Sequence, residues 1–216
     1  DVERSRGLGD VYKRQPYHRV GLSADAIRMG ITGGIRIQND MSKPIVDGFA
    51  AYDDAIQKPL GYITKDGVEV GREEDKAEIE AWQELNPVRV EITKSQVTVK
   101  ATLLQSDLQT NSLFYGVDPS AMTTNADGSV TITEQGHPEL KNCVLYLDVV
   151  DKDKARRIVL ANARITERGS MKYTTEDAVV YEVTWTAFPG KDGWSVKTTF
   201  KEGWKAETTA TPGAIS

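Results

Sequence analysis

The sequence predicts a mainly β domain, an antiparallel sandwich or barrel of about eight to ten strands with one short helix at 107–115. Apolar and polar residues alternate through 88–103, the pattern of strands with one buried face. Residues 143–150 are almost all apolar and indicate a buried strand. Clusters of Gly, Pro, Asn and Asp punctuate the remaining segments, as is typical of all-β folds.

The first strand is expected at 31–37, with Gly33 and Gly34 at a bend or bulge. Residues 38–59 read as a long irregular loop, which is uncommon unless the loop has a function. A hairpin is expected next, because Lys65-Asp66-Gly67 is a turn signal between two short apolar runs, 60–64 and 68–70.

The segment 73–83 is ambiguous between helix and strand. Its run of charged residues suits a helix, yet Ile79 and Ala81 alternate with charged neighbours, which favours an extended segment from about Ala77. Two antiparallel strands should follow, at 88–93 and 97–103, joined by a turn at Lys94-Ser95-Gln96.

The helix at 107–115 should begin at Ser106 or Asp107 as N-cap and end at Gly116. A polar excursion at 119–142 contains a hairpin turn, and its role is not predicted. The C-terminal half returns to strands, with a turn at Lys152-Asp153-Lys154. These strands are expected at 143–150, 157–167, 179–188 and 194–200, and a mobile tail at 208–216.

The composition favours one domain without a metal centre. The 216 residues carry a formal net charge of -5, which argues against a basic surface that wraps nucleic acid. Cys143 is the single cysteine, and His18 and His137 are the two histidines, so a multi-cysteine or histidine-rich metal site is excluded. The sequence has no apolar run long enough for a membrane-spanning helix.

The chain opens with residues that look foreign to the domain. Residues 5–15, SRGLGDVYKRQ, resemble the in-frame translation of a common sequencing adapter. We therefore expect 1–15 to be a non-native segment, as opposed to a basic N-terminal arm, and 16–216 to form the single domain. The true N-terminus is not fixed by the sequence.

A search for chemistry finds no catalytic, metal or cofactor residues. No nucleophile elbow is present, and Cys143 lies inside a predicted strand. Asp151-Lys152-Asp153 begins like a calcium loop but lacks its glycine and final glutamate. The turn 125–129 and the acidic run 73–80 are explained as a plain turn and a solvated surface. Four tryptophans suit core or interface anchoring better than a carbohydrate platform: Trp82, Trp185, Trp194 and Trp204.

From residue 22 onward the sequence resembles the major tail tube proteins of long-tailed, non-contractile bacteriophages, especially those of actinobacterial phages. The resemblance rests on ordered blocks spread over most of the chain and is least clear at 119–142. The blocks are SADAIR at 23–28, ITGG at 31–34, LGYITKDGV at 60–68, IEAWQ at 79–83 followed by PVR at 87–89, TLLQ at 102–105, LFYG at 113–116 and VYEVTWTAFP at 180–189.

This resemblance implies a virion protein that is not an enzyme and needs no cofactor. Six subunits would form a ring, and rings would stack into a tube through which DNA passes without specific binding. The partners would be further copies and the tape-measure, tail-tip and tail-terminator proteins, in the virion tail and, during assembly, the host cytoplasm. The N-terminal arm, 22–37, and the loop 38–59 would bridge adjacent rings.

The same resemblance supplies candidate contact residues. The candidates for the subunit interface are Ile31, Ile35, Tyr62, Trp82, Arg89 and Trp185, and Glu91 is the candidate for the lumen. An acidic protein suits a conduit for DNA, because a negative lumen repels phosphate. A contractile tail, a bacteriocin or a type VI secretion tube is an alternative setting, because the same subunit fold can serve all of them. A monomeric β-sandwich that binds carbohydrate or a host surface is a further alternative.

Overall fold

The computed structural model describes residues 27, 29–134, 136 and 141–202. The chain divides into two units, Asp1–Gly30 and Ile31–Ser216, and the sheet and the helix belong to the second. Several sequence expectations lie outside the described residues: the segment 1–15, most of the arm before residue 30, both histidines, Trp204 and the tail 208–216.

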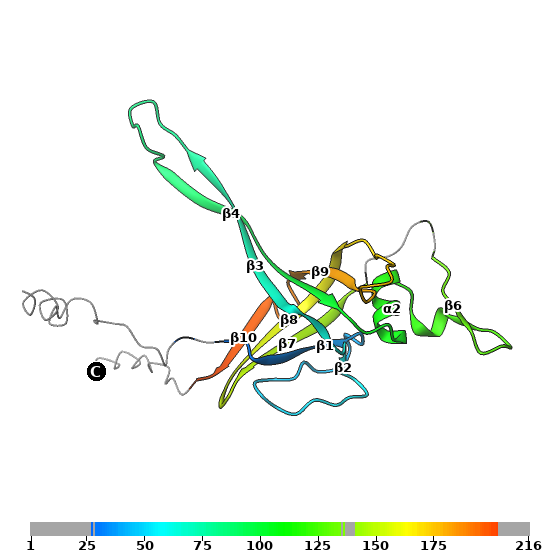
Figure 1. Ribbon diagram of the computed structural model, residues 1–216. Helices are drawn as coiled ribbons and strands as arrows, with labels where there is room; N and C mark the ends of the chain where they lie inside the picture. The colour runs from blue at the N-terminus through cyan, green and yellow to red at the C-terminus, as the bar shows by residue number, and fades with distance from the viewer. Residues whose placement is uncertain (1–26, 28, 135, 137–140, 203–216) are drawn as a thin grey trace, which may run out of the picture. The chain divides into compact units, whose positions relative to one another are not determined.

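The described part is mainly β, as the sequence predicts, with one α-helix (Figure 1). One antiparallel sheet runs in the order β2-β1-β7-β8-β9-β4-β3, and β10 pairs with β8 beside this path. Its strands are β1 Thr32–Gln38, β2 Lys58–Pro59, β3 Ile63–Ile79, β4 Arg89–Leu103, β7 Cys143–Asp151, β8 Lys154–Arg168, β9 Tyr181–Phe188 and β10 Val196–Lys201.

Strand β1 forms at the expected position and lies between the two-residue edge strand β2 and β7. It pairs with β7 in unbroken register from Thr32 to Gln38, so the expected bulge is absent. Gly33 is needed for another reason: an added Cβ would lie 2.3 Å from the carbonyl oxygen of Asp148 on β7. Residues 32–37 are therefore part of the sheet, and an arm can only comprise residues before Thr32.

Two turns expected from the sequence lie instead within long strands, each at or next to a bulge. Lys65-Asp66-Gly67 falls inside β3, where the register with β4 shifts between Ile63 and Val68 and Gly67 takes a φ of 76°. Lys94-Ser95-Gln96 falls inside β4, beside a second shift at Asp75. Asp66-Gly67 suits a bulge as readily as a turn, whereas Lys94, Ser95 and Gln96 are paired with residues 73–75 of β3. Of the ambiguous segment 73–83, residues 73–79 belong to β3 and residues 80–83 lie beyond its end.

Strand β8 is the centre of the sheet. Its first half pairs with β7 on one side and β10 on the other, and its second half pairs with β9. The turn between β7 and β8 is the expected one, and Lys152 takes a φ of 57° there. The strands of the C-terminal half thus lie where the apolar runs predicted them.

The helix α2, Leu108–Tyr115, begins and ends as predicted. The Asp107 side chain accepts a hydrogen bond from the backbone N–H of Thr110, and Gly116 ends the helix in the left-handed conformation with a φ of 71°. A short 3-10 helix, η4 Pro119–Ala121, and a small hairpin, β5 Thr123–Thr124 with β6 Val130–Thr131, follow it. The turn of this hairpin is the one expected in the polar excursion.

Apolar side chains from both faces of the sheet are buried. The larger core gathers residues of β1, β4, β7, β8 and β9 and is covered at one end by α2, through Phe114. Trp185 of β9 is fully buried in it. A smaller core on the other face of β7 and β8 contains Val144, Tyr146 and Val159.

Candidate functional site

The loop 39–57, which we call the anchored loop, covers the second face of the sheet. Its residues Met41, Ile45, Val46 and Tyr52 pack against the smaller core. A buried amide network holds the two ends together, because Gln57 Nε2 donates to Gln38 Oε1 at 2.7 Å and Tyr146 Oη donates to the same oxygen at 3.0 Å. The long loop therefore folds back on its own subunit.

A buried guanidinium fixes the middle of the anchored loop. Arg157 of β8 donates to both carboxylate oxygens of Asp148 on β7, at 2.7 and 3.0 Å, and to the backbone carbonyls of Gly48 and Ala50. Its guanidinium lies 4.1 Å from the ring centre of Tyr52. Burial alone would lower the pKa of Arg157, but Asp148 outweighs burial and the pKa is raised. Burial, and then the hydrogen bond to Asp148, raise the pKa of the Tyr52 hydroxyl.

Strands β3 and β4 behave in the opposite way, because they leave the sheet. They pair with each other out to Ile79 and Arg89, whereas β9 pairs with β4 only from Thr98 to Leu103. Figure 1 shows the two strands projecting beyond the other strands of this unit. A two-stranded ribbon is marginally stable by itself, so this projecting hairpin is suited to gain support from a partner.

One row of the projecting hairpin, on the β4 side, is apolar. Val88, Val90 and Ile92, which we call the apolar stripe, are 55%, 51% and 58% exposed. Alternate residues of a strand share a face, and the register places Glu78 opposite Val90 and Lys76 opposite Ile92. A row of exposed β-branched residues on a long ribbon is typical of an interaction surface, since water around such a row is costly.

The tip of the hairpin, residues 80–88, exposes the two largest apolar side chains of this region. Trp82 is 98% exposed and Leu85 is fully exposed. The backbone N–H of Val88 donates to the carbonyl of Ile79 at 2.8 Å, which closes the ribbon, and that of Glu84 donates to Ala81 at 3.1 Å. Glu80 and Glu84 place acidic groups on either side of Trp82 in the sequence.

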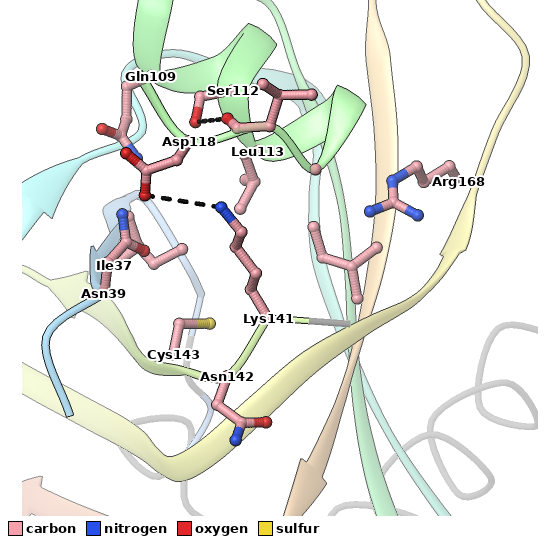
Figure 2. A pocket seen from close by; sticks show the side chains of 13 residues that line it. Ile37, Asn39, Gln109, Ser112, Leu113, Asp118, Lys141, Asn142, Cys143 and Arg168 are labelled. Atoms are coloured by element: carbon pink, nitrogen blue, oxygen red, sulfur yellow. Dashed lines mark hydrogen bonds and ion pairs between the residues drawn. The ribbon is translucent and has the colours of Figure 1, made fainter. Parts of the chain in front are cut away.

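A cavity of about 420 Å³, which we call the end pocket, lies between α2 and the sheet (Figure 2). Gln109 and Leu113 of α2 form one wall, and residues of β1, β7 and β8 form the others, among them Ile37, Cys143 and Ile165. The Cys143 thiol donates to the carbonyl of Ala163, and burial raises its pKa to about 12. Cys143 is thus an inert wall residue, as the sequence suggested.

Charged groups surround the mouth of the end pocket. Lys141 Nζ lies 3.6 Å from a carboxylate oxygen of Asp118, and hydrogen bonds from the Ser120 hydroxyl and backbone N–H lower the pKa of that carboxyl. Arg168 comes close to the C-terminus of α2, where an added Cβ at Gly116 would lie 3.2 Å from its Nη2. Within the described residues Arg168 forms no ion pair.

The candidate contact residues from the sequence fall into two groups. Ile35 and Trp185 are buried in the core, so neither is available to another chain, because their alternating apolar neighbours direct them inward. Ile31 and Tyr62 are exposed, and each lies one residue before a strand, β1 and β3 respectively. Trp82, Arg89 and Glu91 all lie on the projecting hairpin, where Arg89 and Glu91 form an ion pair with each other.

No cluster of three or more His, Cys, Asp or Glu side chains suited to bind a metal ion occurs in the part of the chain that the structure describes. In the 125–129 turn the Asp127 carboxylate accepts hydrogen bonds from Ser129, which stabilise the turn itself. Trp194 packs against the smaller core, so it does not present a carbohydrate platform. No described helix is long and apolar enough to cross a membrane.

Sequence reasoning missed that 63–103 is one continuous hairpin and that an end pocket exists. The sequence did contain a signal for the hairpin. Val88, Val90 and Ile92 form an alternating apolar pattern, but the segment that pairs with them, 73–79, is mostly charged. The signal for the pocket was absent, because its residues come from four separated segments of the chain.

A family model described as "Phage tail tube protein" matches residues 22–210. No curated protein matches the sequence. Several solved structures are similar, each at low identity. The tail of an empty gene transfer agent particle with C6 symmetry has a TM-score of 0.43 at 9% identity and covers 80% of this chain and 99% of that one.

Two further solved structures are similar to the chain. The virion of a native gene transfer agent particle has a TM-score of 0.37 at 9% identity, covering 77% of this chain and 95% of that one. The baseplate of the anti-feeding prophage has a TM-score of 0.39 at 6% identity, covering 82% and 97%.

Proposed function

The chain belongs to the phage tail tube protein family, and from this premise we propose that six copies close a ring and that rings stack head to tail around a lumen for DNA. Membership of the family makes the chain a structural subunit of a virion tail. The six-fold ring, the stacking and the absence of any catalytic role are the parts that we propose. Within the virion the protein would need no cofactor.

The observation that carries the proposal is the projecting hairpin. Its apolar stripe lies beyond the last contact between β4 and β9, so the subunit's own sheet does not cover Val90 or Ile92. Burying such a stripe gains about 25 cal/mol for each Å² of apolar surface removed from water. In a six-fold ring the contact between neighbours is heterologous, so a different surface of the neighbouring copy would cover this stripe.

The sheet edges support ring closure. β3 is the last strand of the sheet order, and at the other end the two-residue strand β2 covers β1 at only two positions. Open edges present backbone N–H and C=O groups that invite another strand. Continuing the sheet from subunit to subunit around an axis closes a barrel and leaves no edge exposed. A rotation that closes gives a ring, and a second, axial contact gives a filament.

The hairpin takes over the bridging role that the sequence analysis gave to the loop 38–59. The anchored loop is tied to its own sheet through Arg157 and Gln38, whereas the hairpin reaches outward. Residues before Thr32 are the remaining candidate for an N-terminal arm. We propose Tyr62, Trp82 and Arg89 as interface residues and Glu91 as a residue of the lumen, where a carboxylate repels phosphate.

The biological setting is a finer part of the proposal. The ordered sequence blocks favour a long, non-contractile tail of an actinobacterial phage over a contractile tail, a bacteriocin or a type VI secretion tube. Its partners would be the tape-measure, tail-tip and tail-terminator proteins. We also propose that residues 1–15 are adapter-derived and dispensable. A sheath gene beside this one would overturn the non-contractile setting.

Electron microscopy of the purified protein tests the proposal. A chain beginning at Leu22 should form six-fold rings or tubes at high concentration, with a lumen wide enough for duplex DNA. Tail-tip and tape-measure proteins should seed longer tubes. A protein that stays monomeric with these partners present, measured by analytical ultracentrifugation, would contradict the proposed function.

A further inference from the structure

We infer that the tip of one subunit inserts Trp82 into the end pocket of another copy, as the axial contact between successive rings. The inference rests on the proposed function and names the two surfaces that meet. Within one subunit the tip and the end pocket are both open to solvent. Their sizes, positions and charges indicate that they fit each other.

The end pocket has the size and lining for an aromatic side chain. Its volume of about 420 Å³ falls within the roughly 300–1,000 Å³ of pockets that bind small ligands. Leu113, Ile37 and Ile165 give it apolar walls, and Gln109 and Asn39 give it amide groups that can accept the indole N–H. Figure 2 shows Gln109, Asn39 and Leu113 around the opening between the helix and the sheet.

Trp82 is the side chain that most needs such a site. It is 98% exposed at the end of the projecting hairpin, where its own subunit offers it no cover. An indole buries roughly 150–250 Å² when it enters a pocket, and tryptophan is enriched among the residues that dominate binding energy. Leu85, also fully exposed, would pack at the rim.

The two surfaces lie at opposite ends of one strand. β4 begins at Arg89, next to the tip, and ends at Leu103, five residues before α2 and the end pocket. A strand of this length spans about 50 Å at ~3.3 Å per residue. A plug at one end and a socket at the other make a head-to-tail contact. Such a contact repeats without closing and so builds a filament.

The charges also match. Arg168 at the pocket mouth has no ion-pair partner among the described residues, and Lys141 adds a second cation beside Asp118. The tip carries Glu80 and Glu84 next to Trp82. An acidic tip entering a basic mouth favours this orientation over contact between two tips, where like charges would meet.

Disulfide trapping tests the contact directly in the assembled protein. Gln83→Cys together with Asn142→Cys places a thiol beside Trp82 and another at the pocket mouth, in one full-length chain. Mild oxidation of assembled protein should give a ladder of dimers, trimers and larger species linked from residue 83 to residue 142, mapped by mass spectrometry. The Gln83→Cys single variant is the control, since Cys143 is buried and should not react.

Three outcomes of the trapping experiment are informative. The ladder supports the inference. Tubes that form without any 83–142 link, or that yield only 83–83 dimers, overturn it while the proposed function survives. A wild-type protein that never forms rings or tubes overturns the proposed function and the inference together.

A charge exchange provides an independent readout. Arg168→Glu and Glu84→Arg should each raise the concentration needed for tube formation at least about tenfold, and the double variant should recover most of the loss. Glu74→Arg, the same charge change on the shaft of the hairpin, is the matched control and should not rescue Arg168→Glu. Rescue by the shaft variant, or none by the tip variant, overturns the assignment of the tip to the pocket.

Discussion

The anchored loop and the projecting hairpin are both long excursions from the same sheet, yet they have opposite fates. The loop has little regular structure, and its apolar and polar side chains are satisfied within the subunit by the smaller core, Gln38 and Arg157. The hairpin is paired along its length apart from two bulges, and the apolar side chains of its outer part face water. In this chain, therefore, regular secondary structure does not show which segment has all of its apolar and polar groups satisfied within the subunit.

Replacing Arg157 should produce the largest effect on the stability of the subunit. Arg157→Ala leaves Asp148 without its charged partner and two loop carbonyls without their donor, and breaking a buried pair costs about 3–5 kcal/mol in the free energy of unfolding. Denaturant titration measures this loss. Arg72→Ala, an exposed arginine on the hairpin, should change stability by less than about 0.5 kcal/mol. An equal loss of unfolding free energy in both variants would contradict the difference between the anchored loop and the projecting hairpin.

The buried amide pair at the ends of the anchored loop should matter somewhat less. Gln57→Ala removes one of the two donors to Gln38 Oε1 and the acceptor of the Asp53 backbone N–H, and a partly buried polar group that loses its partner costs about 1–3 kcal/mol. The free energy of unfolding should fall by that amount, and the loop should become more sensitive to limited proteolysis. An unchanged cleavage rate in the loop would show that packing alone holds it in place.

The apolar stripe should affect assembly and leave folding almost unchanged. Val90→Ser with Ile92→Ser should shift the free energy of unfolding by less than about 0.5 kcal/mol, because both side chains are already exposed. The concentration for tube formation should rise at least about tenfold, which equals about 1.4 kcal/mol. Lys94→Ser on the same strand is the control. A large loss of monomer stability would mean that the stripe is covered within the subunit.

The smallest expected effect is on the stability of the subunit at acid pH. Hydrogen bonds from the Ser42 hydroxyl and backbone N–H lower the pKa of Asp40, in the anchored loop, below 3.8. The carboxylate therefore adds stability above the unfolded pKa, and this contribution is lost as the pH falls through the lowered value. Asp40→Asn should flatten that part of the acid unfolding curve, monitored by circular dichroism. An identical acid curve would show that the loop does not depend on this turn.

The sequence predicted the mainly β fold, the strands of the C-terminal half and both caps of α2, because these features follow from local apolar patterns and capping chemistry. It failed at Gly67, where a bulge and a turn have the same composition, and at Lys94, which is paired within β4 beside a bulge, because only strand pairing distinguishes these cases. Among the contact candidates, it located Trp82 and Glu91 on the hairpin. It also proposed Ile35 and Trp185, because a strand pattern does not tell whether an apolar face meets its own core or another subunit.

Hydrogen–deuterium exchange, compared between the monomer and the assembled protein, tests the central claim most directly. The claim is that the hairpin completes its contacts only in the assembly, whereas the anchored loop is complete in the subunit. Amides of 70–94 should exchange quickly in the monomer and become protected in tubes, while protection of 39–57 stays the same. Tubes in which the hairpin remains unprotected and the loop gains protection would contradict the account.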